Sequence, residues 1–394
     1  MITFKPCILI MNKLRVGLTL LTAITSFSAF AQGGSGVIIG QDTLNRVIST
    51  AVPFLTITPD SRAAGMGDAG VATSADANGN YWNAGKMAFI ENGYGVSASY
   101  TPWLGKIIND MYLFHLSGYY KITREQTVSA SMKYFDMGEV QFNHGPNPDQ
   151  QDGRFNPREF AFDVGYSRKL TEELGIGGAL RYIHSNLLGS NSNVSDARPG
   201  NSLAVDVGVY YTKPMVSKNA TLSLGAAITN LGSKMTYSDT NNKSFIPTNL
   251  RVGGAYKTFV NPLNSFIFAL DFNKLMVPSP GHQDASFLNG VFGSFGDAKG
   301  GFKEEIHEIT ISSGIEYWYN DAFAGRVGYF SEAKDKGNRK YMTFGVGARH
   351  KKFGLDVAYM VPTNKRENAL AETIRFTLFL KFIAKDKEDE SVID

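Results

Sequence analysis

Short segments in which apolar and polar residues alternate recur along most of the chain. In 127–134, valine, alanine, methionine and tyrosine alternate with threonine, serine and lysine. A period of two residues is typical of β-strands that have one apolar and one polar face. The same alternation occurs in 112–120, 203–211 and 266–273. We therefore predict an all-β chain in which one apolar face repeats from strand to strand.

About fourteen such segments can be marked along the sequence. An even number of strands suits a closed bacterial barrel. The strand centres are expected near Val96, Leu116, Ser131, Val164, Leu180, Val207, Gly225, Gly253, Phe268, Ser313, Val327, Gly345, Val357 and Leu378.

The connections between these segments alternate in length. An outer-membrane β-barrel has tight turns on its periplasmic side and long loops on its exterior side, whereas a soluble β-sandwich gives no reason for this sorting. We therefore predict a transmembrane antiparallel outer-membrane β-barrel over residues 93–383. Short turns are expected at 121–126, 168–174, 213–220, 319–322 and 351–353, and longer polar loops at 138–158, 187–200, 232–247 and 274–307.

Residues 1–31 have the pattern of a secretory signal peptide. Lys13 and Arg15 precede an apolar run, and residues 29–31 supply the small side chains that a signal peptidase recognises. Cleavage removes Cys7, the only cysteine, and so excludes disulfide bonds and thiolate metal sites from the mature chain. It also leaves 36 basic and 36 acidic residues, a balance that gives no global attraction for nucleic acid.

Two segments flank the predicted barrel. Residues 32–92 are too few to form a separate core of much stability. Because a barrel of about fourteen strands is wider than its own side chains can fill, we expect this extension to pack inside the barrel or against its periplasmic mouth. The charges of residues 384–394 predict a solvated periplasmic tail.

Three glycines in the extension raise the question of a nucleotide site. Gly65, Gly67 and Gly70 have the spacing of a dinucleotide-binding loop. The residues before them include Pro53 and Pro59 instead of the buried parallel strand that such a loop needs. Small residues also let the backbone turn tightly and approach its neighbours closely. We therefore interpret the three glycines as packing residues of the extension.

Three motifs of the extension resemble the amino-terminal signature of a known family. They are Ser61-Arg62-Ala63-Ala64-Gly65-Met66-Gly67, Ala75-Asp76-Ala77 and Trp82-Asn83-Ala84-Gly85-Lys86-Met87. Together with the approach segment 53–60, they are similar to the PorV (LptO) family of the type IX secretion system, within the FadL-like barrels. In those barrels a related Asn-Pro-Ala-Gly element lies in a luminal hatch, and here Ala84 replaces the proline and Gly85 the following alanine. The resemblance implies a structural role in a hatch for Arg62, Gly65, Gly67, Gly70, Asp76 and Asn83.

The resemblance also implies a shuttle and receptor rather than an enzyme. PorV-like proteins associate with the SprA/Sov translocon and receive exported cargo through its carboxyl-terminal signal domain. They deliver this cargo to the PorU sortase attachment complex. On this basis we expect the chain in the cell outer membrane, with both termini in the periplasm and with no cofactor, metal or catalytic residue.

Apolar side chains in two predicted exterior loops are candidates for contact with cargo or partner proteins. Exposed apolar clusters often mark interfaces. The alternative for the first loop is that it rests on the barrel rim, with its tryptophan in the aromatic girdle. The prolines and aspartates of the second loop equally suit an inert, solvated turn. The candidates are Trp103, Leu104, Ile107 and Ile108 in the first loop and Phe142 and Phe155 in the second.

Two other clusters suggest catalysis or metal binding. His115 and Ser117 have the spacing of the His-x-Ser pair of outer-membrane phospholipases, but period-two geometry points both toward the barrel interior, without a third group to orient them. Three glutamates and a histidine within 304–308 could attract a divalent ion. A charged loop end before a strand is far commoner.

A FadL-type channel for small hydrophobic molecules is the alternative function, because it shares this fold. Fold alone does not separate the two functions. A channel should have a pocket lined by apolar side chains beneath its exterior loops. A cargo receptor can instead have a blocked lumen and a binding surface on its exterior.

Overall fold

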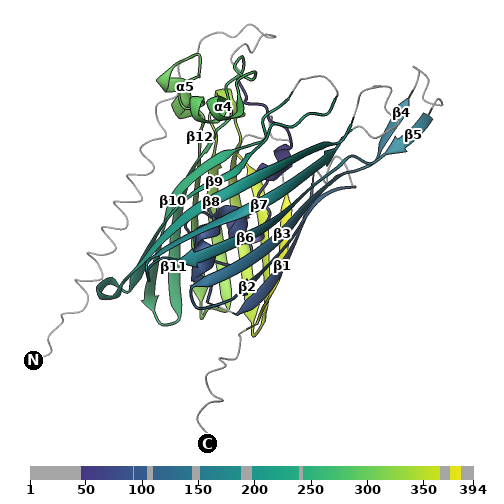
Figure 1. Ribbon diagram of the computed structural model, residues 1–394. Coiled ribbons are helices and arrows are strands. Elements are labelled where there is room, and N and C mark those ends of the chain that lie inside the picture. Colours follow the sequence, from purple (N-terminus) through teal and green to yellow (C-terminus); the bar gives the residue numbers. More distant parts are fainter. Residues whose placement is uncertain are drawn as a thin grey trace, which may run out of the picture. The chain divides into compact units, whose positions relative to one another are not determined.

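The alternating segments form fourteen antiparallel strands that close into a barrel in the computed structural model of the chain (Figure 1). Closure is made by β16, which pairs with β1 from Tyr94↔Phe382 to Tyr100↔Phe376. Every expected strand centre falls within a strand, so the predicted barrel is confirmed. The strands are β1 (Tyr94–Pro102), β2 (Met111–Lys121), β3 (Gln126–Met137), β6 (Arg158–Lys169), β7 (Leu174–Asn186), β8 (Gly200–Met215), β9 (Ala220–Gly232), β10 (Asn249–Asn261), β11 (Asn264–Leu275), β12 (Ile309–Tyr319), β13 (Phe323–Ser331), β14 (Lys340–His350), β15 (Phe353–Pro362) and β16 (Ile374–Phe382).

Residues 45–394 form one unit, which is described by itself. Within it the structure describes residues 46–91, 93–103, 110–143, 151–187, 198–238, 243–363 and 373–382. The predicted signal peptide and charged tail lie outside the described residues, and the domain boundaries at 31, 92 and 383 stay predictions.

The two faces of each strand differ in the way that the sequence indicated. In β3 the inward residues Thr127, Ser129, Ser131 and Lys133 are buried and polar. The outward face of the barrel is apolar and exposed, as at Leu203 on β8, which is 68% exposed. Such a wall suits lipid, and in a closed barrel every strand has a hydrogen-bonding neighbour within the membrane.

The short connections meet at one end of the barrel, here called the short-turn end, and the longer ones meet at the other, the long-loop end. The turn between β12 and β13 shows why the short connections are so tight. Only residues 320–322 lie between the two strands, and the amide of Ala322 donates to the carbonyl of Tyr319 at 3.0 Å. Asn320 and Asp321 have φ angles of 51° and 49°, so two successive left-handed residues form this tight β-turn.

Several smaller elements join the strands. The ribbon of β4 (Val140–Asn143) and β5 (Gln151–Phe155) occupies part of a connection that the sequence had predicted as a loop, since residues 140–143 repeat the strand alternation in miniature. None of the described helices is long and apolar enough to cross a membrane. The helices are η2 (Pro53–Thr56), α2 (Ser61–Ala64), α3 (Gly79–Trp82), η3 (Ala84–Phe89), η4 (Val216–Lys218), α4 (Phe287–Gly293), α5 (Phe302–His307) and η5 (Lys334–Lys336).

Candidate functional site

Most of residues 46–91, called the N-terminal segment below, lies inside the ring of strands (Figure 1), and its first residue, Arg46, pairs with Glu304 of α5 at the long-loop end. Backbone amides of this segment donate to inward side chains on several strands. The amides of Gly70 and Val71 both donate to Oδ2 of Asp271 on β11, at 2.6 and 2.8 Å. The amide of Ser61 donates to Thr377 on β16, and that of Gly67 to Thr343 on β14, each at 2.9 Å.

The three glycines lie where a side chain would collide with a neighbour. Gly67 has a φ of +68°, and a Cβ atom there would come within 2.5 Å of the backbone nitrogen of Tyr329. Because that neighbour is strand backbone, it has little freedom to move aside. A Cβ at Gly65 would lie 3.1 Å from Cα of Gly345, and one at Gly70 would lie 2.3 Å from the ring of Trp82.

Arg62 joins the N-terminal segment to the barrel wall through buried ion pairs. Its guanidinium donates from Nε and Nη2 to both oxygens of Glu316, at 3.0 and 2.9 Å, and from Nη1 to Asp76 at 3.0 Å. Glu316 also accepts from Arg326, which in turn donates to Asp356 at 2.8 Å. Two-pronged pairing of this kind fixes orientation as well as charge.

Asn83 uses both ends of its amide. Oδ1 accepts from the backbone amide of Gly85 at 2.9 Å, while Nδ2 donates to the carbonyls of Val71 and Val209 at 3.2 and 2.9 Å. The side chain is completely buried. All six residues expected in the hatch therefore belong to the buried contacts of the N-terminal segment, and whether they act as a hatch stays a prediction.

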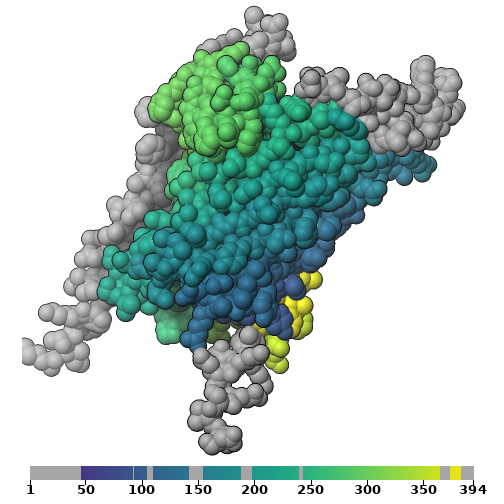
Figure 2. Space-filling model, viewed as in Figure 1, coloured from purple at the N-terminus to yellow at the C-terminus, as the bar shows by residue number. Residues whose placement is uncertain are grey.

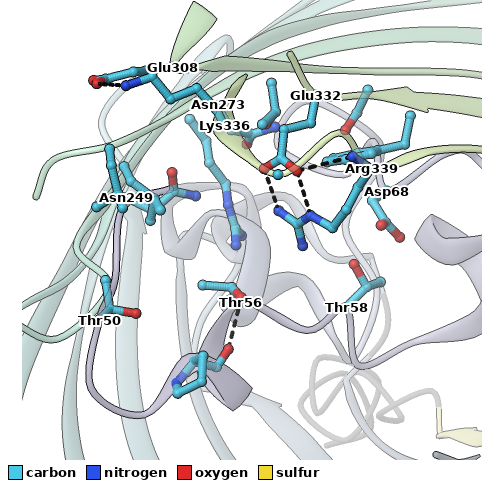
Figure 3. Close-up of a pocket in the computed structure, with 18 of the residues that line it drawn as sticks. Thr50, Thr56, Thr58, Asp68, Asn249, Asn273, Glu308, Glu332, Lys336 and Arg339 are labelled. Carbon is cyan, nitrogen blue, oxygen red and sulfur yellow. Dashed lines mark hydrogen bonds and ion pairs between the residues drawn. The ribbon is translucent and has the colours of Figure 1, made fainter. Parts of the chain in front are cut away.

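A cavity of about 350 Å³ lies between the N-terminal segment and the long-loop end (Figure 3). Hydroxyl and charged groups supply much of its wall, and several of them pair across it. Arg339 donates from Nε and Nη2 to the two oxygens of Glu332, both at 2.8 Å. The polar side chains that line it include Thr50, Thr56, Thr58, Asp68, Asn249, Arg251, Asn273, Glu308, Glu332, Lys336 and Arg339.

The glutamates of 304–308 are paired with cations. Lys336 lies 2.8 Å from Glu304 and 2.9 Å from Glu308, and Lys274 lies 3.1 Å from Glu305. Burial alone would raise the pKa of Glu304, but hydrogen bonds from Lys336 and the backbone of Gly300 outweigh it and lower the pKa to about 2. Within the described ranges, no group of three or more His, Cys, Asp or Glu side chains is arranged to hold a metal ion.

Helices α4 and α5 present an apolar surface to solvent above this ion cluster. In α5 the usual arrangement is reversed, since Glu304 and Glu305 are buried whereas Phe302 and Ile306 are 81% and 51% exposed. A surface helix normally turns its apolar stripe toward the protein. Figure 2 shows the helices, in light green, standing out at one end of the barrel. The surface, called the α4–α5 surface below, consists of Leu288, Phe292, Phe295, Phe302 and Ile306.

This surface lies within residues 274–307, for which the sequence predicts one long polar loop. A signal was present, since Phe287, Leu288, Val291, Phe292 and Phe295 recur at helical spacing. Val291 alone of these is fully buried, at the contact between α4 and the rest of the structure.

The loop residues proposed from the sequence lie in varied surroundings. Trp103 is half-buried, and its ring meets that of Phe135 edge-on at 5.7 Å, next to the apolar core of the N-terminal segment. Phe155 is half-buried on β5. Phe142 belongs to β4. Leu104, Ile107 and Ile108 lie outside the described residues, so a role in partner binding stays a prediction for this set.

His115 and Ser117 both point inward and are buried. The Ser117 hydroxyl donates to Oδ1 of Asn78 at 2.8 Å. Neither ring nitrogen of His115 has a hydrogen-bond partner among the described atoms. The pair therefore lacks the nucleophile–base contact that serine catalysis needs.

One family has a sequence model that matches this chain. It is described as "Type IX secretion system protein PorV", and it matches residues 40–282. The match covers more than half of the chain and includes all three motifs of the N-terminal segment. No curated protein matches the sequence.

Solved structures with a similar fold include bacterial channels. The TodX deltaS2S3 mutant, a monoaromatic hydrocarbon channel, has a TM-score of 0.51 and 11% identity over 82% of this chain and 98% of its own. The TodX deltaS2 mutant has a TM-score of 0.50 with the same identity and coverage. A FadL homologue of Pseudomonas aeruginosa has a TM-score of 0.44 and 10% identity over 86% of this chain and 99% of its own. These likenesses concern the fold alone.

Proposed function

This chain belongs to the PorV family of type IX secretion system proteins, and from that premise we propose that it is the shuttle and receptor for exported cargo in the outer membrane. It would bind the carboxyl-terminal signal domain of cargo at the SprA/Sov translocon and pass it to the PorU attachment complex. The family and the barrel support a role in outer-membrane protein secretion that needs no chemistry of its own.

In this proposal the short-turn end and both termini face the periplasm, and the long-loop end faces the exterior. The long connections give the exterior face the larger and more variable surface, as in other outer-membrane barrels. Recognition sites are commonly carried by loops on a rigid scaffold. Cargo and partners would therefore meet the protein at the long-loop end.

The α4–α5 surface is the observation that carries the proposal. Its five apolar side chains are between 47% and 81% exposed, while the glutamates of α5 are held beneath by lysines. Large exposed apolar residues cost solvation free energy unless a partner covers them. Aromatic side chains are also typical of the residues that contribute most to protein–protein affinity.

A FadL-type channel for small hydrophobic molecules is the alternative, and its support is the shared fold. Pockets for such ligands are mostly apolar, with few polar groups. The cavity at the long-loop end instead carries six charged side chains, from Asp68 to Arg339. The N-terminal segment, hydrogen-bonded to β11, β14 and β16, fills the lumen beneath it. The receptor is therefore the function that the geometry supports better.

Substitution within the α4–α5 surface tests the proposal. Phe302→Glu combined with Ile306→Glu should reduce secreted cargo and translocon recovery about tenfold or more, because truncating central apolar contacts typically removes at least ~2 kcal/mol of binding free energy. Lys303→Glu lies on the same helix and changes the net charge by the same amount as the double substitution, so it is the matched control. Cells with this variant should secrete cargo normally. Unaltered heat-modifiable gel mobility would show that both variants form the barrel. Normal secretion by the double variant would contradict the assignment of this surface.

A further inference from the structure

A second cavity, of about 470 Å³, opens at the short-turn end between the N-terminal segment and the strand ends. Its wall includes backbone and side chains from 74–78 and 89–91, together with residues of β10, β12 and β14–β16. Aromatic rings of Phe89, Trp318 and Phe379 contribute to it. The charged groups of the wall are Arg62, Asp76, Glu91, Lys257, Asp321, Arg349, Lys351, Lys352, Asp356 and Lys381.

The two arginines of this cavity are already paired. Arg62 binds Glu316 and Asp76, as described above, and Arg349 donates to both oxygens of Asp356, at 3.0 and 2.8 Å. Two of the four carboxylates in the wall, those of Asp76 and Asp356, are therefore paired with arginines. Glu91 and Asp321 are left to balance the lysines.

Four lysines of the wall have no ion pair with any carboxylate in the part of the chain that the structure describes. They are Lys257, Lys351, Lys352 and Lys381. Three of their ammonium groups lie over ring faces, at centroid distances of 4.7 Å for Lys257 over Phe259, 5.2 Å for Lys352 over Phe382 and 5.8 Å for Lys381 over Phe379. We call these four residues the lysine cluster.

Two more lysines lie close to the edge of the cavity. The ammonium group of Lys121 donates to the carbonyl of Ile90, and that of Lys169 lies 4.9 Å from the ring centroid of Phe89. Like charges gathered around a partly enclosed space repel one another more strongly than they would in open water. An anionic group bound in this space would relieve that repulsion.

We propose that the occupant is the acidic tail of this same chain, residues 385–394. The tail carries five carboxylate side chains against two lysines, Lys385 and Lys387, which gives it a net charge of −3 opposite to that of the cluster. It begins four residues after Lys381, a member of the cluster, and the amide of Lys381 donates to the carbonyl of Lys352. The described chain therefore ends one residue after a lysine of the cluster, and this end tethers the tail.

Tethering makes this docking favourable even if each ion pair is weak. A segment joined to its site by a few residues has an effective concentration of about millimolar or higher. The docked tail would cover the cavity between the N-terminal segment and the short-turn end, which a solvated tail would leave open. This inference goes beyond the proposed function and does not depend on it.

Disulfide trapping in the full-length chain tests the docking. Ser74 is exposed in the cavity wall, so Ser74→Cys and Ser391→Cys, with Cys7→Ser, place one thiol in the cavity and one in the tail. In detergent at low salt, with oxidised glutathione added as the two-electron oxidant, the pair should form a disulfide about tenfold faster with the native tail than with a neutral tail of equal length. The neutral tail carries Asp386→Asn, Glu388→Gln and Asp389→Asn, which bring its net charge from −3 to 0, and it has the same reach.

The same assay examines the other side of the contact. Lys351→Gln, Lys352→Gln and Lys381→Gln together should reduce the rate for the native tail to that of the neutral tail, and raised salt should do so in part because it screens charge. Heat-modifiable mobility checks that the barrel has formed. Equal rates of disulfide formation for the native and neutral tails would overturn the proposal, and so would a rate that the lysine substitutions do not change. The lysine cluster would then be a site for an anion from another molecule. Because no secretion is measured, failure here is distinct from failure of the proposed function.

Discussion

At Gly67 the N-terminal segment touches the barrel backbone to backbone. Its left-handed φ and the 2.5 Å approach of a would-be Cβ to Tyr329 both require glycine. We expect Gly67→Ala to lower the free energy of unfolding by about 3 kcal/mol, because left-handed strain adds to a clash that strand backbone cannot relieve.

Urea unfolding in lipid vesicles, followed by tryptophan fluorescence, measures this effect. Gly325→Ala on β13 is the control, since φ there is not left-handed and no heavy atom lies within 4 Å of an added Cβ. The control should unfold like the parent chain. Equal stability of the Gly67→Ala variant and the parent would show that the N-terminal segment does not need this close approach.

For single residues, the sequence predicts the direction of a side chain within a strand but not its contacts with residues far away along the chain. Period-two alternation predicts that His115 and Ser117 point inward, because one register fixes the face of every residue in a strand. It does not predict that Arg62 would bind Glu316, since that contact joins residues 254 positions apart. For Trp103 the sequence left an exposed loop and the barrel rim as alternatives, and the structure places its ring against Phe135.

At the scale of elements, α5 is the least expected feature. Strands were predictable because lipid outside and polar groups inside impose one alternating pattern along the whole barrel. A six-residue helix imposes no comparable pattern, and its orientation here depends on lysines contributed by β11 and η5. The candidate partner surface was therefore missed although the barrel that carries it was predicted.

The ion cluster under α5 gives this element a pH dependence. The pKa of Glu304 is lowered from its ordinary 4.5 to about 2, so its contribution to stability is fully present above about pH 4.5 and is lost as the pH falls toward 2. Glu304→Gln should be less stable than the parent near neutral pH, because Arg46 loses its anionic partner and Lys336 loses one of its two.

That difference in stability should shrink as the solution is acidified and vanish near pH 2. Urea unfolding of the parent and of Glu304→Gln across this range provides the measurement. A difference that is constant with pH, or that grows on acidification, would mean that the carboxylate of Glu304 does not stabilise α5.

For the molecule as a whole, the sequence predicted the barrel and its sorted connections, and the family resemblance is confirmed by the match over 40–282. What it left open was the contents of the lumen. The segment inside is hydrogen-bonded to strands on several sides of the ring, and the cavity above it is lined with charge. The binding surface that we propose therefore lies on the outside of a barrel whose lumen holds the N-terminal segment.

The most direct measurement of this account is the composition of what co-purifies with the protein from its native membrane. Gentle detergent extraction, affinity capture and mass spectrometry would identify both chains and lipids. We predict a large barrel translocon and secreted cargo bearing carboxyl-terminal signal domains. Recovery of the protein alone, with fatty acid or another small hydrophobic molecule in its lumen, would contradict the account and favour a channel.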